Sequence, residues 1–215
     1  MLYNIDIYGS SGELGGAFVK ALSEAHPAAQ IHAFSRRLAS HLPANVKNYQ
    51  IIYDDEASIA EAAAIASQTM KLDLVIVATG ILHDGAITPE KSLRDLSAEK
   101  FHHILTANLI TPALIGKYFL PKLARDKRAI FAALSARVGS ISDNNLGGWY
   151  AYRASKAALN MFIKNAAIEL GRRYQQAINI GLHTGTVDSN LSKPYQSHVP
   201  SEKLFSPAFS AVLAL

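Results

Sequence analysis

The sequence Gly9-Ser10-Ser11-Gly12-Glu13-Leu14-Gly15-Gly16 separates a predicted strand, Leu2 to Tyr8, from a predicted amphipathic helix that ends before Pro27. Strand, glycine-rich loop and helix in this order hold a dinucleotide, because glycines allow a tight turn and the N–H groups of the helix N-terminus reach the pyrophosphate. The spacing is G-x-x-G-x-x-G, not the usual G-x-G-x-x-G. A glycine-rich turn without a ligand therefore remains an alternative. A phosphate-binding loop ending in Gly-Lys-Ser/Thr is excluded, since no such triplet follows.

The second predicted strand, Gln30 to Phe34, runs directly into Ser35-Arg36-Arg37. A site for NAD usually has an acidic residue at this strand end for the ribose 2′-hydroxyl, whereas arginine suits a 2′-phosphate. No Asp or Glu occurs between Gln30 and Val46. We therefore expect NADP(H), with Arg36 as the contact. NAD(H) stays open as the other cofactor, and two solvated loop arginines stay open as the other interpretation.

The rest of the chain continues to alternate strands with helices. We expect strands at Lys47 to Tyr53, Leu72 to Ala78, Arg128 to Leu134 and Ala177 to Leu182, and helices at 56–67, 97–123 (bent by Pro112) and 149–174. The near-continuous apolar run of the fourth strand is typical of a central parallel strand covered on both faces. The pattern predicts a single α/β domain over residues 1–215, with three layers and a Rossmann-like, doubly wound parallel sheet.

Candidate ligand-binding residues follow the predicted strands. In doubly wound sheets, ligands bind at the carboxyl ends of the strands. The residues that fall at those ends are the glycine loop, Arg36, Asp54, Gly80, Ser135 and His183 to Thr186. Their convergence predicts one cleft at this edge of the sheet.

The stretch Tyr152-Arg153-Ala154-Ser155-Lys156 lies within the last predicted helix. Positions i and i+4 share a helix face, so the phenol of Tyr152 and the ammonium of Lys156 point the same way. An ammonium beside a phenol lowers the pKa of the phenol, which makes it a proton donor and acceptor near neutral pH. The alternative is one packed ring and one solvated lysine stem.

Composition excludes several classes of protein. The chain has 215 residues, 49% of them hydrophobic, a net charge of +4 and no cysteine. Isolated arginine pairs do not form the basic stripe of a nucleic-acid-binding protein, and the histidines offer no H-E-x-x-H metal motif. The sequence shows no leader and no apolar run of the roughly 18 residues that a membrane span needs. We expect a cytoplasmic protein that binds neither metal, nucleic acid nor membrane.

Taken together, these motifs resemble the short-chain dehydrogenase/reductase family, within it the C-factor-like, carbonyl-reductase-like group. The similarity runs from Tyr3 to Phe205 and is sharpest from Gly139 to Asn160. The resemblance implies that Tyr152 is the catalytic acid/base and that Lys156 lowers its pKa and binds the nicotinamide ribose. It implies that Asn108 supports a proton relay and that Ser135 lies near the serine that orients the carbonyl.

The resemblance also implies the cofactor contacts. Asp54 matches the acid that contacts adenine. The full set is Gly9, Ser11, Gly12, Leu14, Gly15, Ser35, Arg36, Asp54, Ala78, Thr79, Gly80, Tyr152, Lys156, Gly185, Thr186 and Val187.

Four positions depart from the family pattern. Val77-Ala78-Thr79-Gly80 lacks the structural Asn of the fourth strand, and Ala136 stands where a second serine is often found. Thr184 replaces a proline. Residues 206–215 are expected to form about two helical turns, without the family's last strand.

The expected activity is hydride transfer between a nicotinamide and a small-molecule carbonyl or alcohol. Residues 189–205 should form a substrate lid with an apolar wall. Trp149 should lie in the core or an interface, and His183 should be structural. The resemblance implies a homodimer or homotetramer paired through the helices near 98–120 and 150–172. The alternatives are a cofactor-binding signalling protein with little or no catalysis, and a truncated product of an enzyme gene.

Overall fold

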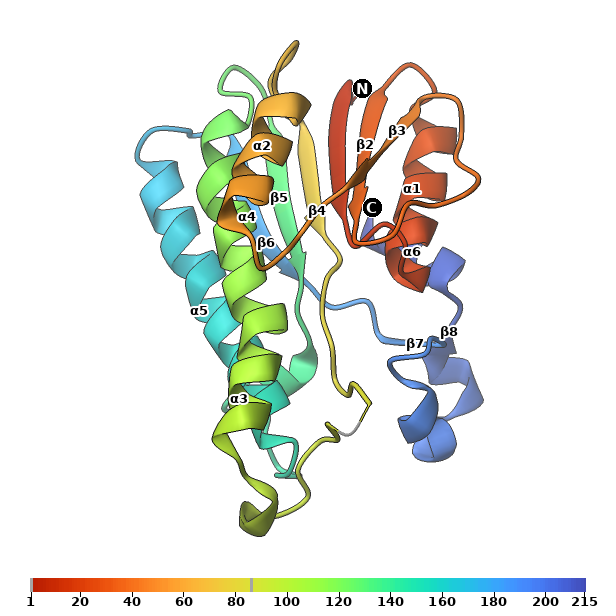
Figure 1. Cartoon of the computed structure of the whole chain (residues 1–215), viewed down its shortest axis with the longest axis vertical. Helices are drawn as coiled ribbons and strands as arrows, with labels where there is room; N and C mark the ends of the chain where they lie inside the picture. The colour runs from red at the N-terminus through yellow and green to blue at the C-terminus, as the bar shows by residue number, and fades with distance from the viewer. Residues whose placement is uncertain (1, 86) are drawn as a thin grey trace.

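The computed structural model describes residues 2–85 and 87–215, and a sheet of six parallel strands crosses its middle (Figure 1). The strand order is β3-β2-β1-β4-β5-β6, with every neighbouring pair parallel. The chain thus starts at the centre, winds to one edge and returns to build the other half, as predicted for a doubly wound sheet. The strands are β1 Asn4–Tyr8, β2 Gln30–Ser35, β3 Val46–Gln50, β4 Leu74–Val77, β5 Ala129–Leu134 and β6 Ala177–Leu182.

Helices cover both faces of this sheet and complete three layers (Figure 1). On one side lie α1 (Glu13–Ala25) and α6 (Pro207–Ala214); on the other lie α2 (Glu56–Ala66), α4 (Thr111–Phe119) and α5 (Tyr150–Gly171). Because successive side chains of a strand point to opposite faces, β1 serves both cores. Ile5 and Ile7 pack toward α1, and Tyr8 stacks on Phe34 in the other core.

The third strand is shorter than predicted, since it ends at Gln50 and not at Tyr53. Tyr53 turns back toward the glycine loop, where its hydroxyl accepts a hydrogen bond from the Gly9 N–H (2.8 Å) and donates one to the Phe34 carbonyl (3.3 Å). Asp55 then caps α2 through its side chain. These contacts tie the end of β3 to the loop that follows β1.

The helix predicted over 97–123 is a run of four pieces. It consists of α3 (Ala98–Leu105), the π-helical turn η2 (Thr106–Ile110), α4 and the 3-10 turn η3 (Leu120–Lys122). The irregularity expected at Pro112 takes the form of that π turn, in which Thr111 N–H donates to the Thr106 carbonyl. Proline has no N–H to continue the regular ladder, and it sits in the first turn of α4. Asn108 is therefore carried, fully buried, by an irregular turn.

Residues beyond β6 form a separate lobe beside the carboxyl ends of the strands (Figure 1). Strands β7 (Thr186–Val187) and β8 (Leu204–Phe205) pair in parallel and enclose the 3-10 turns η5 (Lys193–His198) and η6 (Ser201–Lys203). Helix α6 has the two turns that the sequence predicted. Its Ser210 hydroxyl donates to the Thr184 carbonyl (3.1 Å), and its Ala211 is buried in the α1 core. In the described residues no strand pairs with the outer edge of β6.

Within residues 2–85 and 87–215, none of the helices has both the length and the apolar character that crossing a bilayer requires. The same residues contain no group of three or more His, Asp or Glu side chains arranged to hold a metal ion.

Candidate active site

Tyr152 and Lys156 lie one helical turn apart near the start of α5, and both line a cavity of about 800 Å³ at the carboxyl ends of the strands. Lys156 is only 3% exposed. Its Nζ donates a hydrogen bond to the carbonyl of Leu134 at the end of β5 (2.8 Å) and lies 5.7 Å from the centre of the Tyr152 ring. Phenol and amine therefore share one wall of the cavity, as the i, i+4 spacing predicted.

Burial shifts the pKa values of both groups toward their neutral forms. It raises the pKa of Tyr152 to about 12 and lowers the pKa of Lys156 to about 8. The expectation that Lys156 lowers the pKa of Tyr152 toward neutral is wrong for this structure. The reason is that desolvation of the phenolate outweighs the effect of the Lys156 ammonium, which lies 5.7 Å from the ring and donates its hydrogen bond to the Leu134 carbonyl. At neutral pH Tyr152 thus keeps its proton, as a general acid must before it acts.

The opposite wall is the N-terminus of α1 with the glycine loop. Gly12, Glu13, Leu14 and Gly15 line the cavity, and no side chain caps the helix at Gly12. A Cβ on Gly15 would lie 2.1 Å from the Gly9 carbonyl oxygen, so only glycine permits this close turn. An uncapped helix N-terminus offers free N–H groups and a favourable dipole to an anion such as a pyrophosphate.

Ser135 lines the cavity, but its hydroxyl is engaged elsewhere. Ser135 Oγ donates to Asn160 Oδ1 at 2.6 Å. Ala136, next to it on the cavity wall, has no hydroxyl to offer. Neither residue therefore offers a free hydrogen-bond donor for orienting a substrate carbonyl. Ala136 has no hydroxyl, and Ser135 donates its hydroxyl to Asn160.

Asn108 does not reach the cavity with its side chain. Its Nδ2 donates to the Ile81 carbonyl (2.8 Å) and to Ser155 Oγ (3.1 Å), and its Oδ1 accepts from the Ile81 N–H (2.8 Å). Ser155 Oγ in turn donates to the Tyr152 carbonyl (2.7 Å). The amide thus fastens the segment after β4 to the helix that carries Tyr152, which is a positioning role.

The structure brings together about two thirds of the residues expected to contact a cofactor. Those that line the cavity, besides Tyr152 and Lys156, are Gly12, Leu14, Gly15, Ala78, Thr79, Gly80, Gly185, Thr186 and Val187. Thr79 Oγ1 is buried without a hydrogen-bond partner. Gly185 has φ +73°, and a Cβ there would lie 2.6 Å from the Phe205 ring, which explains why a glycine opens the lobe.

Five expected contacts do not line this cavity. Gly9 uses its N–H on Phe34 and Tyr53, and Ser35 Oγ donates to the Arg37 carbonyl. Ser11, Arg36 and Asp54 are exposed. Arg36 follows β2 and Asp54 lies in the turn after β3, so both are at the strand ends where the sequence put them, outside the enclosed space.

Two further aromatic rings line the cavity and a third adjoins it. The sequence predicted an apolar wall in residues 189–205, which include Tyr195. It missed the part of Trp149 and His83. Trp149, expected in the core or an interface, lines the cavity with its ring 6.1 Å from that of Tyr152 and 5.1 Å from that of Tyr195. The Tyr195 ring lies 5.9 Å from that of His83. The apolar residues expected between 189 and 205 were the only signal for this wall.

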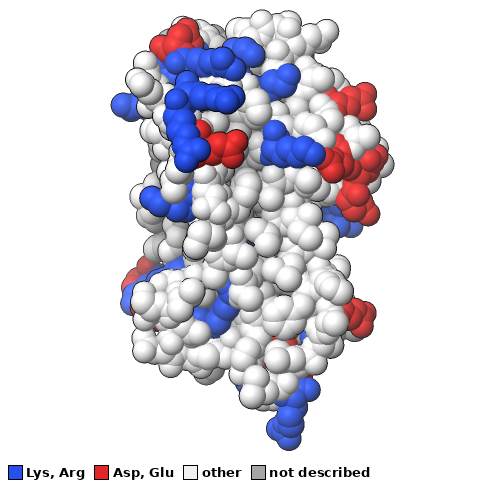
Figure 2. Space-filling model, turned by 90° about the vertical axis from the view of Figure 1, so that its left-hand side faces the viewer, with Lys and Arg blue, Asp and Glu red and all other residues white. Residues whose placement is uncertain are grey.

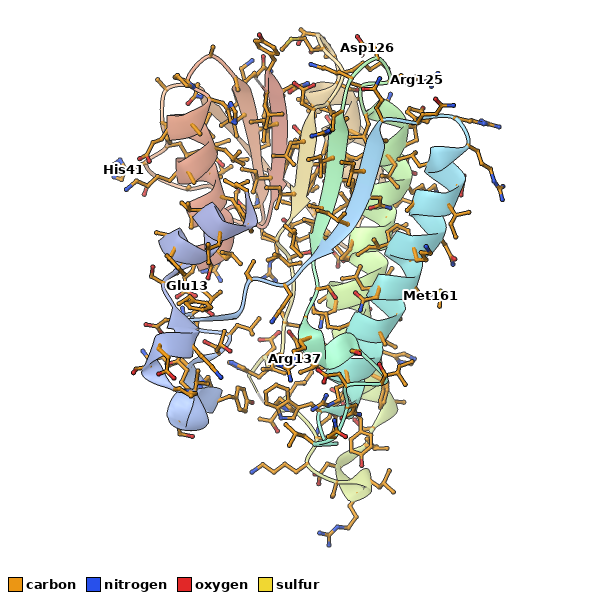
Figure 3. The ribbon with its side chains drawn as sticks, turned by 180° about the vertical axis from the view of Figure 1, so that it is seen from behind. Glu13, His41, Arg125, Asp126, Arg137 and Met161 are labelled. Atoms are coloured by element: carbon orange, nitrogen blue, oxygen red, sulfur yellow. The ribbon has the colours of Figure 1, made fainter. Side chains whose placement is uncertain are left out.

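Polar residues complete the mouth of the cavity. His183, expected to be structural, lines it, and burial together with the Arg137 charge lowers its pKa. Arg137 lies between the lobe after β6 and α5 (Figure 3), paired with Asp143 at 2.6 Å. The arrangement as a whole can bind an extended anionic ligand along α1 and present a phenol and an amine to its far end.

Comparison with known proteins places this geometry in a family. A family model described as Enoyl-(Acyl carrier protein) reductase, which belongs to the short-chain dehydrogenase/reductases, matches residues 19–198. The C-signal protein of Myxococcus xanthus is 32% identical over 103 residues, covering 48% of this chain and 61% of that protein. The chain spans 61%, 59% and 56% of the length of three curated relatives that it matches.

Solved structures share the fold at low sequence identity. The carbonyl reductase Sniffer of D. melanogaster superposes with a TM-score of 0.83 at 22% identity, covering 98% of this chain and 89% of that one. The NADPH-bound carbonyl reductase from chicken fatty liver superposes with a TM-score of 0.81 at 21% identity, covering 100% and 89%. With a family model matching most of its length and the family's fold throughout, this chain belongs to the short-chain dehydrogenase/reductase family.

Proposed function

We propose that this protein is an NADP(H)-dependent oxidoreductase that transfers a hydride between the nicotinamide and a small-molecule carbonyl or alcohol. The observation that carries the proposal is a single cavity with two different walls. One wall is the uncapped N-terminus of α1, and the other holds Tyr152 and Lys156. A dinucleotide lying along such a cavity joins the two walls, because its pyrophosphate suits the first and its ring end faces the second.

The residues present fit that cofactor. The N–H groups of the α1 N-terminus suit the pyrophosphate, the buried and unpartnered Thr79 hydroxyl offers a polar contact, and Arg36 suits a 2′-phosphate. When bound, the nicotinamide supplies or accepts the hydride. The carbonyl reductase from chicken fatty liver that shares the fold binds NADPH, which supports the same choice here. NAD(H) remains the competing cofactor for the binding experiment.

In reduction, Tyr152 donates its phenolic proton to the carbonyl oxygen as negative charge develops there. Burial keeps Tyr152 protonated at neutral pH, so its proton is available for transfer, and the nearby Lys156 ammonium stabilises the phenolate that remains. Ser135 adds little to this step while its hydroxyl is donated to Asn160. Trp149 and Tyr195 give the substrate end an aromatic wall, which favours carbonyl compounds with an apolar substituent.

A second function, a cofactor-binding signalling protein with little catalysis, is favoured by one observation. Ala136 has no hydroxyl and Ser135 donates its own to Asn160, so neither residue offers a free donor to the carbonyl oxygen. The similarity of the chain to C-signal agrees with this. The intact pair of Tyr152 and Lys156 favours the enzyme, since a sensor has no need of a buried acid and amine on one wall.

The test has two measurements on the purified protein. Thermal stabilisation by NADPH and by NADH establishes binding, and NADPH consumption with aryl ketones, aryl diketones and aliphatic aldehydes establishes catalysis. We expect stronger stabilisation by NADPH and turnover with at least one carbonyl. Binding without any turnover would favour the signalling function, and the absence of binding would contradict both.

Arg36 provides the control for cofactor choice. Arg36→Ala should weaken NADPH binding by about 10- to 100-fold, the effect of one lost charge-assisted contact, and leave NADH binding nearly unchanged. Arg37→Ala, at the neighbouring exposed arginine, should change neither. Equal effects of the two substitutions would remove Arg36 from the 2′-phosphate site.

A further inference from the structure

Glu90 is a buried acid that lies outside the sequence motifs that identify the family. It lies in the segment between β4 and η1 (Leu93–Asp95), and only 2% of its surface is exposed. Acidic side chains are rarely buried without a partner. In the described part of the chain, the ion pairs formed by basic side chains all involve other acids. The partner of Glu90 is instead the N-terminus of α5.

Helix α5 begins without a cap of its own. Its N-cap residue is Trp149, with φ 51° and ψ 44°, and no side chain of the flanking sequence caps the first turn. Glu90 satisfies two of the free N–H groups: its backbone carbonyl accepts from Trp149 N–H at 2.6 Å, and its Oε2 accepts from Ala151 N–H at 3.2 Å. A carboxylate is also the group that a helix N-terminus stabilises best.

The backbone that Glu90 meets is strained. Gly147, Gly148 and Trp149 are three consecutive residues with positive φ, and Trp149 is the one non-glycine residue of the described chain in that region. A tryptophan stays in a left-handed conformation only where its surroundings hold it. Arg153 also stabilises this turn, because its Nε donates hydrogen bonds to the carbonyls of Gly147 (3.2 Å) and Gly148 (3.0 Å).

This turn sets the position of two rings of the cavity. Tyr152 follows the turn within the first helical turn of α5, and Trp149 packs edge-on against both Tyr152 and Tyr195. We propose that Glu90 is a positioning residue that caps α5 in place of a local side chain, holds Trp149 in its left-handed conformation, and thereby fixes the phenol of Tyr152 relative to the substrate. The proposal rests on the function proposed above and adds to it a residue that touches neither substrate nor cofactor.

The experiment compares Glu90→Ala, which removes the side-chain acceptor of the Ala151 N–H and leaves the backbone carbonyl that accepts from Trp149, with Glu90→Gln, which keeps a side-chain acceptor oxygen at the same length. Glu99→Ala, at an exposed acid in the first turn of α3, is the matched control. Trp149 is the single tryptophan of the chain, so intrinsic fluorescence and its quenching by acrylamide report on this turn alone. The kinetic measurements are kcat and KM for the carbonyl, together with the Kd for NADPH.

For Glu90→Ala we expect kcat to fall by about 10- to 100-fold, as small displacements of a catalytic group do, with Kd for NADPH changed by less than about twofold. Acrylamide quenching of Trp149 should rise in the same variant. Glu90→Gln should recover most of kcat and of the quenching value, and Glu99→Ala should match the wild type in every readout.

A Glu90→Ala protein that melts at lower temperature but keeps wild-type kcat and quenching would show that Glu90 only stabilises the fold, and would overturn the proposal. If that variant does not fold, Glu90→Asp takes its place, since it withdraws the carboxyl group by one methylene. Glu90→Asp should lower kcat and raise the acrylamide quenching of Trp149. Wild-type values of both would overturn the proposal. Should the wild type reduce no carbonyl, the proposed function fails, while the quenching comparison still decides the role of Glu90 in holding Trp149.

Discussion

The burial of Lys156 determines how the charge in the proposed active site changes with pH. Its amine is buried against β5, donates to the Leu134 carbonyl and has a pKa lowered by burial to about 8. Tyr152, whose pKa burial raises to about 12, stays protonated over the whole physiological range. Of the two groups, the lysine is therefore the one that changes charge near neutral pH.

This difference predicts the pH profile of carbonyl reduction. Below its pKa of about 8 the amine carries the positive charge that stabilises a phenolate on Tyr152; above that pH it loses the charge. The kcat for reduction should hold steady from about pH 6 to about pH 7.5 and fall as the pH rises through 8 toward 10. A profile that is flat to about pH 10 would contradict the assignment of Lys156.

We expect substitutions at the neighbouring residues Ser135 and Ala136 to affect kcat differently. Because the Ser135 hydroxyl is donated to Asn160, Ser135→Ala should leave kcat within about threefold of the wild type. Ala136→Ser places a hydroxyl on the cavity wall and should raise kcat about tenfold or more, the scale of one added donor to a developing oxyanion. Steady-state kinetics with one carbonyl substrate measures both. A large loss in Ser135→Ala would show that its hydroxyl turns to the substrate.

At this scale the sequence predicted what depends on local spacing. Tyr152 and Lys156 share a wall because they are four residues apart on a helix, and the glycine loop is recognisable from its own residues. Three features needed the fold: the direction of the Tyr152 pKa shift, the side-chain bonds of Asn108, and the buried carboxyl of Glu90 at α5. Each depends on contacts between segments tens of residues apart, which periodicity does not encode.

Among the elements, the parallel, doubly wound sheet followed from the alternation of strands and helices and from the apolar runs, since a strand covered on both faces has little choice of residue. The order of the strands came from the structure. The misjudged boundaries have physical causes. Strand β3 ends early because Tyr53 bonds to Gly9, and the long central helix is interrupted by a π turn beside Pro112. Trp149 was misplaced because its backbone is left-handed, a conformation that nothing in its residue type predicts.

The unit formed by β1, the glycine loop and α1 gives an element-scale prediction. A methyl group on Gly15 would lie 2.1 Å from the Gly9 carbonyl oxygen, which is backbone and cannot swing aside. Gly15→Ala should therefore shift α1 away from the loop, lower the unfolding free energy by about 1–3 kcal/mol and weaken NADPH binding at least about tenfold. Denaturant titration and cofactor fluorescence measure the two effects.

The control for this substitution is Gly171→Ala at the end of α5, where an added Cβ meets nothing within 4 Å. It should leave NADPH binding unchanged and the unfolding free energy unchanged or raised by up to about 1 kcal/mol. If Gly15→Ala changed stability and NADPH binding as little as this control, the close packing of Gly15 against the Gly9 carbonyl would not be needed for either.

For the molecule as a whole, the outer face of α5, which packs beside α4, carries large exposed apolar side chains. Ile168 is 50% exposed and Met161 61% exposed, and Met161 points away from the sheet (Figure 3). Figure 2 views the molecule from this side: Lys and Arg gather toward one end, and the middle carries few charges. The family resemblance implies that these helices pair between subunits, and exposed apolar patches are typical of such surfaces.

We therefore predict a homodimer or homotetramer at micromolar concentration. Met161→Glu should place a charge in the interface and release monomers, whereas Met70→Glu, at an exposed methionine outside α4 and α5, should leave the assembly intact. Light scattering coupled to size-exclusion chromatography gives the mass directly. A wild-type monomer would contradict the prediction, and so would an assembly insensitive to Met161→Glu.

The proposed chemistry depends on Tyr152 acting as the proton donor at the far end of a bound dinucleotide. The most direct measurement is NADPH turnover by Tyr152→Phe with a carbonyl that the wild type reduces, alongside the Kd for NADPH from cofactor fluorescence. Removing one hydroxyl and nothing else should reduce kcat by about 10²- to 10⁴-fold, the range of general acid catalysis, and leave Kd within about twofold. Wild-type turnover by Tyr152→Phe would contradict the role of Tyr152 as the proton donor.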